Sequence, residues 1–132
     1  MMLKSINPYK NTLIKEYMPY SRGKIDSIIN DASFEFKQWK YLEYSKRRNV
    51  LLSISKSLEE NVQEHAEMIT DEIGKPISES KIEVLKCAWV VKYFAENAED
   101  FLQNEIIKTD YKESYIQYEP LGVILGIMPW NF

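Results

Sequence analysis

The sequence predicts an α/β fold in which a strand hairpin is followed by three long antiparallel helices and then by further strands. Two observations predict it. Apolar residues recur every three or four positions through most of residues 21–103, which is the period of an amphipathic helix. On both sides of that stretch, short runs rich in Tyr, Ile and Val are bounded by Pro, Gly and Asn, as strands are. The expected division is 1–20 for the hairpin, 21–103 for the helical bundle and 104–132 for the later strands.

The hairpin is the first expected element. Residues 6–9 and 13–17 are predicted to be its strands, and Lys10, Asn11 and Thr12 are predicted to be its turn, because Asn is a frequent turn residue.

Three helices are expected next. The first runs from the N-cap Ser21 to about Lys40. The second covers residues 45–74, where one apolar stripe continues until Gly74 ends the helix and Pro76 forbids its continuation. The third covers residues 78–102 and is apolar over more than one side, as a buried helix is. Their short connections predict an antiparallel bundle.

Two strands are expected after the bundle. Residues 111–118 alternate between polar and apolar without a clean pattern, which favours an edge or interface strand. Residues 123–128 are a continuous run of apolar and β-branched residues, typical of a strand covered on both faces in a parallel sheet. Such a strand needs neighbours. In a chain of 132 residues alone, we expect the bundle to persist and this strand not to be fixed.

The loop that follows this strand carries one polar side chain, that of Asn131. In open α/β sheets, ligands gather beyond the carboxyl ends of the strands. A side-chain amide at such a place can donate hydrogen bonds to an oxygen that gains negative charge. The alternative interpretation is structural: Asn131 caps its own backbone, as Asn often does in loops.

Several motifs resemble one family. Residues 119–123 read Glu-Pro-Leu-Gly-Val and residues 126–132 read Gly-Ile-Met-Pro-Trp-Asn-Phe, and together they resemble the signature of the NAD(P)-dependent aldehyde dehydrogenase superfamily. Residues 74–77, Gly-Lys-Pro-Ile, and residues 93–99, Tyr-Phe-Ala-Glu-Asn-Ala-Glu, are most similar to succinate-semialdehyde dehydrogenases. The resemblance covers the entire chain in order. It implies the N-terminal part of that fold, in which residues 123–128 are the first buried strand of the cofactor-binding sheet.

The resemblance also implies roles for a few residues. Asn131 corresponds to the side-chain donor to the oxyanion that forms when a cysteine thiolate attacks the aldehyde. Ile127, Met128, Pro129 and Trp130, together with Asn131, match the stretch that lines the ribose and nicotinamide part of an NAD or NADP site. The family's nucleophilic Cys and general-base Glu follow this signature. We therefore expect the 132-residue chain alone to be inactive and to bind the cofactor weakly.

In the complete enzyme, the resemblance implies a small-molecule aldehyde as substrate and a homo-oligomer joined through residues 111–118, from Tyr111 to Tyr118. Two hypotheses remain open for the chain itself. It is the N-terminal fragment of an aldehyde dehydrogenase, shortened by a stop, a frameshift, gene splitting or an incomplete sequence. Alternatively, it is a free-standing helical interaction module or gene relic that associates with full-length subunits.

Composition excludes other function classes. The chain has 17 Lys and Arg against 20 Asp and Glu, a net charge of -3 and a pI near 5.3, so it lacks the basic excess that binds nucleic acid or anionic membranes. No apolar run has the length of a signal peptide core or a membrane span. A single cysteine suits a reducing compartment, and a cytoplasmic location is expected.

The remaining reactive residue types predict no further site. Cys87 precedes the Pro-Trp-Asn signature, so it is not the family's nucleophile, and we expect a small hydrophobic residue in a helix. His65 is the only histidine, which excludes a two-histidine metal site. The four glycines cannot form a phosphate-binding GxGxxG pattern. Solvated helix faces are expected for Glu59, Glu60, Glu64, Glu67, Lys46, Arg47 and Arg48.

Overall fold

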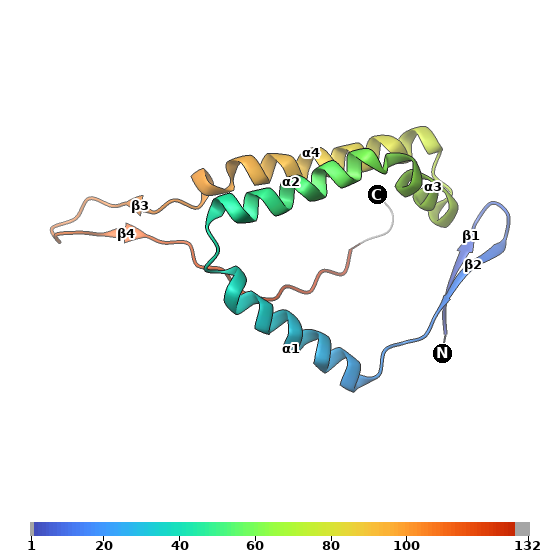
Figure 1. The fold of residues 1–132 in the computed structure, drawn as a ribbon, viewed down its shortest axis with the longest axis horizontal. Coiled ribbons are helices and arrows are strands. Elements are labelled where there is room, and N and C mark those ends of the chain that lie inside the picture. Colours follow the sequence, from blue (N-terminus) through green and yellow to red (C-terminus); the bar gives the residue numbers. More distant parts are fainter. Residues whose placement is uncertain (1, 129–132) are drawn as a thin grey trace.

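The computed structural model describes residues 2–128, and within them it contains four helices and four short strands. In chain order these are β1 (Leu3–Asn7), β2 (Thr12–Tyr17), α1 (Arg22–Trp39), α2 (Tyr44–Glu60), α3 (Val62–Ile73), α4 (Ile77–Phe101), β3 (Glu105–Ile106) and β4 (Tyr115–Ile116). Figure 1 shows α2, α3 and α4 gathered together, with the β1–β2 hairpin beside α3 and α1 apart from the three helices. The predicted α/β class is confirmed.

The β1–β2 hairpin is antiparallel. Its first strand ends at Asn7, two residues earlier than expected. The next residue, Pro8, has no amide hydrogen to donate. The side-chain oxygen of Asn7 accepts hydrogen bonds from the backbone amides of Tyr9 and Lys10, at 3.0 and 2.9 Å. Asn11 completes the turn with a φ of 52°, a left-handed conformation that Asn tolerates.

Side-chain hydrogen bonds fasten the hairpin to the end of α3. The Asn7 amide donates to Asp71 Oδ1 at 2.9 Å, and the Ser5 hydroxyl donates to Glu72 Oε1 at 2.7 Å. Asn7 is only 5% exposed. One buried amide therefore both ends β1 and joins it to a helix that lies 64 residues further along the chain.

The second expected helix is divided in two. The apolar stripe predicted one helix over residues 45–74, but α2 ends at Glu60 and α3 begins at Val62. Asn61 lies between them with a φ of -109° and a ψ of 24°. Both its backbone N–H and its side-chain amide donate to the carbonyl of Ser57, at 3.1 and 2.8 Å. Because Asn side chains compete for backbone groups, Asn61 breaks the helix where the apolar period gives no warning.

Small residues bring α4 close to α2 and α3. The buried apolar residues among those described are Ala66, Val84, Ala88 and Ala95. Two buried serines join the helices: Ser55 on α2 donates to the Ala88 carbonyl on α4 at 2.8 Å, and the hydroxyls of Ser80 and Thr70 lie 3.0 Å apart. The core between these helices is therefore narrow and partly polar.

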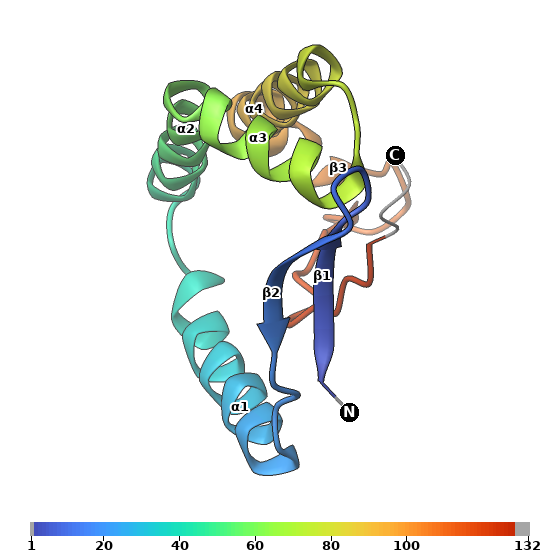
Figure 2. The ribbon, with the colours of Figure 1, turned by 90° about the vertical axis from the view of Figure 1, so that its right-hand side faces the viewer.

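α1 does not join the bundle, contrary to the expected arrangement of three antiparallel helices. Its start is as predicted, since Ser21 Oγ accepts a hydrogen bond from the Lys24 amide at 3.2 Å. However, none of its residues, all of which are described, is buried, and Figure 2 shows it standing away from α2, α3 and α4. The bundle consists of α2, α3 and α4. No helix within residues 2–128 is both long enough and apolar enough to cross a membrane.

The turn from α3 to α4 is held by backbone geometry and by an ion pair. Gly74 ends α3 in the left-handed conformation, with a φ of 79°, and its amide donates to the Thr70 carbonyl at 2.9 Å. Lys75 Nζ lies 2.5 Å from Glu83 Oε2, and both side chains are 27% exposed. A residue with a Cβ at position 74 would meet Pro8, because that Cβ would lie 3.0 Å from Pro8 Cγ.

We expect Gly74→Ala to lower the free energy of unfolding by about 1–2 kcal/mol, since the left-handed conformation strains any residue with a Cβ and the added carbon crowds Pro8. Thermal unfolding followed by circular dichroism measures this. Gly23→Ala is the matched control: a Cβ there meets nothing within 4 Å, and alanine favours the helix interior. A similar loss in both variants would contradict the explanation.

The strands expected after the bundle are short or not formed. Of residues 111–118, Tyr115–Ile116 pairs with β3 Glu105–Ile106, and Ile107 donates to the Ser114 carbonyl at 2.8 Å. Residues 123–128, all of them described, form no strand. This is the outcome expected for an apolar strand to which residues 2–128 supply no neighbouring strand.

Candidate functional site

The site predicted from the sequence lies at the end of the segment that follows β4. Figure 1 shows this segment, coloured red, running back from β4 toward the end of the molecule where α3 lies. It first turns at Gly122, whose φ is 109°. There it passes α1, because a Cβ on Gly122 would lie 3.8 Å from the ring of Phe36. This contact is where the segment that leads to the predicted site meets the first helix.

Two of the predicted cofactor residues are described. Ile127 and Met128 are 86% and 82% exposed and lie in neither a helix nor a strand. Pro129, Trp130 and Asn131 lie outside the described residues. A site for a nucleotide needs walls on several sides. Because Ile127 and Met128 are almost fully exposed, the described residues alone do not fit a nicotinamide cofactor at this position.

A hollow of about 420 Å³ lies between α1 and the segment. Ala32, Phe36, Trp39 and Leu42 line one side of it, and Gly122 and Val123 line the other. Its lining is mainly apolar and also includes Glu35 and Gln38. This lining suits the binding of apolar side chains rather than catalysis.

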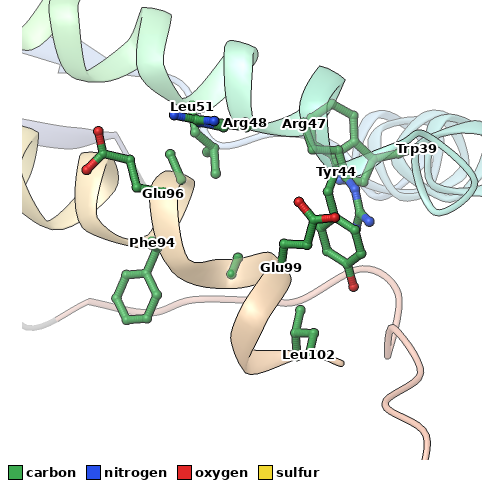
Figure 3. Close-up of a pocket in the computed structure, with 11 residues that line it drawn as sticks. Trp39, Tyr44, Arg47, Arg48, Leu51, Phe94, Glu96, Glu99 and Leu102 are labelled. Carbon is green, nitrogen blue, oxygen red and sulfur yellow. The ribbon is translucent and has the colours of Figure 1, made fainter. Parts of the chain in front are cut away.

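A second hollow, of about 300 Å³, lies between the start of α2 and the end of α4. Figure 3 shows Arg47 and Glu99 pointing into it from the two helices, with Tyr44 beside them. The guanidinium carbon of Arg47 lies 4.2 Å from the centre of the Tyr44 ring, a cation–π distance. Its Nε is buried and has no hydrogen-bond partner among the described residues.

This charged hollow contains no nucleophile beside a base. The Tyr44 ring stabilises the Arg47 guanidinium, and the Arg47 Nε is a donor without an acceptor in the described part of the chain. The sequence prediction placed Arg47 on a solvated face, and this was wrong in one respect, since Arg47 is only partly exposed while Lys46 and Arg48 are exposed. Arg47 follows Tyr44 by three positions, which places the two side chains on one face of a helix. This spacing was the sequence feature from which the contact between Arg47 and Tyr44 could have been predicted.

The other reactive side chains lie on α2, α3 and α4. Cys87 is on α4, but it is exposed rather than packed as a small hydrophobic residue. His65 is partly exposed on α3. The carboxylates Glu59, Glu60, Glu64 and Glu67 are exposed. No group of three or more His, Cys, Asp or Glu within residues 2–128 could hold a metal ion.

The exposed aromatic side chains of α4 form a possible contact surface that was not predicted from the sequence. Trp89 and Tyr93 stack on α4 with ring centres 5.9 Å apart, and Tyr93 also contacts Phe94 edge-on at 5.5 Å. Trp89 is 62% exposed and Phe94 is 51% exposed. The sequence indicated that this helix is apolar over more than one side, and the structure shows that only one of those sides is covered.

The whole chain is similar to one family of known proteins. The model of the aldehyde dehydrogenase family matches residues 1–132. A probable NADP(+) succinate-semialdehyde dehydrogenase from Synechocystis is 35% identical over all of this chain, which corresponds to 29% of that protein. An NADP(+) succinate-semialdehyde dehydrogenase from Mycobacterium avium is also 35% identical and is covered to 29%.

Solved structures agree with the sequence comparison. The glyceraldehyde-3-phosphate dehydrogenase GapN from Methanocaldococcus jannaschii, complexed with NADP, superposes with a TM-score of 0.90 and 29% identity over 98% of this chain and 28% of that one. An indole-3-acetaldehyde dehydrogenase in its apo form gives a TM-score of 0.89 and 27% identity, with 99% and 31% covered. The chain therefore spans less than a third of the length of the relatives it matches.

Proposed function

This chain belongs to the aldehyde dehydrogenase family, and we propose that it is the N-terminal portion of an NADP-dependent enzyme that oxidises succinate semialdehyde to the acid. The observation that carries the proposal is the 35% identity, over the whole chain, to relatives named for that substrate and cofactor. The motifs at residues 74–77 and 93–99, which resemble succinate-semialdehyde dehydrogenases, support the same substrate. A cytoplasmic location is part of the proposal.

Asn131 has the catalytic role in this proposal. Its side-chain amide donates a hydrogen bond to the aldehyde oxygen, which gains negative charge when the carbonyl carbon is attacked. Ile127, Met128, Pro129 and Trp130 form one wall of the cofactor site. The support for this role is the resemblance of residues 126–132 to the family signature.

The tyrosine-bearing stretch of residues 111–118 is proposed to join subunits. Tyr111 is 83% exposed and Tyr115 is 48% exposed. The β3–β4 pair is only two residues long on each strand, so it leaves exposed backbone on both sides, which another chain can pair with.

A polypeptide of these 132 residues is proposed to be inactive by itself. Its single cysteine, Cys87, is exposed on α4 and precedes the Pro-Trp-Asn signature, which the family's nucleophile follows. The walls of a cofactor site around Ile127 and Met128 must come from further protein.

A chimera tests the proposal. Residues 1–132 replace the matched N-terminal stretch of the Synechocystis relative, and NADPH or NADH formation is followed with succinic semialdehyde and each cofactor. We expect turnover with NADP+ by the chimera and none by the 132-residue polypeptide. The unmodified relative is the control. Turnover by the polypeptide alone would overturn its proposed inactivity, and a folded chimera that oxidises other aldehydes but not this one would overturn the substrate.

A further inference from the structure

The two helix ends that border the charged hollow carry charges of the unfavourable sign for their own helices. Lys46, Arg47 and Arg48 lie near the start of α2, whose first turn has no acidic residue and, within the described chain, no side-chain cap. Glu96 and Glu99 lie near the end of α4, whose last turn has no basic residue. A helix has a partial positive charge at its start and a partial negative charge at its end. Each helix therefore gathers like charges at this point.

These two ends face each other. Figure 1 shows α2 and α4 side by side, and the hollow of about 300 Å³ joins the start of one to the end of the other. Arg47 and Arg48 line it from α2, and Glu96 and Glu99 line it from α4. Because Glu96 and Glu99 are three positions apart on one helix, their carboxylates repel each other. Opposite charges across the hollow are the available compensation for both helix ends.

The compensating ion pair is not formed in the structure. The Arg47 guanidinium lies over the Tyr44 ring, at 4.2 Å from its centre, and its buried Nε has no acceptor among the described residues. A buried donor without an acceptor is unfavourable. Glu99 is exposed, and Figure 3 shows its carboxylate pointing into the hollow with Arg47. The acceptor that Arg47 lacks is therefore present on the neighbouring helix.

We propose that Arg47 and Glu99 form a clasp between the start of α2 and the end of α4. In the open state, which is the state of the structure, the guanidinium lies on Tyr44. In the closed state it turns to Glu99 and donates a charge-assisted hydrogen bond to the carboxylate. Arg48 and Glu96 add to the attraction across the hollow. Closing satisfies the buried donor and neutralises charge at both helix ends.

The position of the clasp gives it a conformational role. Trp39, the last residue of α1, and Leu102, the C-cap of α4, also line the hollow. They mark the two points where the bundle is joined to α1 and to β3. The closed clasp holds both points, and the open clasp releases them. It is built only from described residues and does not depend on the proposed function.

A double-mutant cycle tests the charge pair. Arg47→Glu and Glu99→Arg each change the charge at their own helix end, and each also places like charges across the hollow. Together they restore an opposite pair in reversed order. The cycle cancels what each residue does within its own helix. We expect the double variant to unfold at a midpoint about 4 °C or more above the value given by adding the two single shifts. Circular dichroism measures the midpoints and shows whether each variant folds.

The matched control cycle combines Arg47→Glu with Asp100→Arg. Asp100 is exposed at the same helix end as Glu99 but does not line the hollow, so its shift should add to that of Arg47→Glu. Additive shifts in the Glu99 cycle, or equal coupling in both cycles, would overturn the clasp. Coupling that 1 M NaCl leaves unchanged would also overturn it, because salt screens a pair with an exposed carboxylate.

Amide hydrogen exchange tests the conformational role. The backbone amides of Leu42 and Leu102 each donate a hydrogen bond of 3.1 Å at the two points that the clasp holds. Glu99→Gln removes the charge at nearly the same size, and we expect it to speed exchange of both amides about two- to fivefold. The Gly74 amide, which donates to Thr70 at the end of α3, is the internal control and should be unchanged. Equal acceleration of all three amides would show a general loss of stability and would overturn this role.

Discussion

Asn131→Ala in the chimeric subunit is expected to lower kcat for succinic semialdehyde about 10²–10³-fold and to change KM much less. The side-chain amide donates to an oxygen whose negative charge develops only as the carbonyl is attacked, so its loss acts on the transition state more than on the bound aldehyde. Steady-state rates of NADPH formation with NADP+ in excess measure the effect.

Asn131→Asp separates this role from the structural alternative. An aspartate has nearly the same size and can still accept a hydrogen bond from its own backbone, so it preserves a turn cap. As a carboxylate it has no hydrogen to donate, and its charge repels an oxyanion. We expect the aspartate variant to be at least as impaired as the alanine variant. Activity retained by Asp and lost by Ala would mean that Asn131 is a cap.

The matched control for Asn131 is Asn49→Ala. Asn49 is exposed on α2 and has no part in the proposed site, so kcat should stay at the level of the chimera. If Asn49→Ala lowered kcat as much as Asn131→Ala does, the loss would reflect the stability of the chimera rather than its chemistry.

Local signals in the sequence placed most of the helices correctly. The 3.6-residue period located α1 and α4, Ser21 marked the start of α1, and Gly74 marked the end of α3. These features are encoded within a few residues of where they act, because capping and left-handed conformations depend on local side chains and backbone. The bounds of such elements follow from the chain itself.

Features that depend on distant residues were not predicted. The apolar stripe runs across Asn61 without a break, so the division between α2 and α3 is visible only from the hydrogen bonds that Asn61 makes. The separation of α1 from the bundle was not predicted, because an amphipathic pattern indicates that one face of a helix is covered but does not indicate which element covers it. The apolar run at residues 123–128 also depends on neighbours, and it forms no strand, as expected for this chain alone.

The residues of the candidate site also could not be assigned from local sequence patterns alone. The loop chemistry alone left Asn131 with two interpretations, and the family resemblance favoured one of them. Arg47 lies in a run of basic residues and was expected to be solvated. In the structure its Nε is buried, in the hollow that Tyr44 also lines. Whether a charged group is buried depends on the neighbouring helix, which here is α4.

Ala88→Leu is expected to cause the largest loss of stability in the bundle. Ala88 is 0% exposed where α4 meets α2, and the added carbons have no room unless the helices separate. Separation would break the 2.8 Å hydrogen bond from Ser55 to the Ala88 carbonyl. Overpacking together with the loss of a buried hydrogen bond costs about 2–4 kcal/mol, so the midpoint of thermal unfolding should fall by about 10 °C or more.

Cys87→Leu is the matched control for this substitution. It introduces the same side chain one position earlier on the same helix, but on an exposed site, and surface changes of this kind usually stay within about 0.5 kcal/mol. Circular dichroism of the chain follows both variants. If the two leucines destabilised the chain equally, the close contact between α2 and α4 would not be the source of the loss. A stable Ala88→Leu variant would mean that the helices part without penalty, which the buried Ser55 argues against.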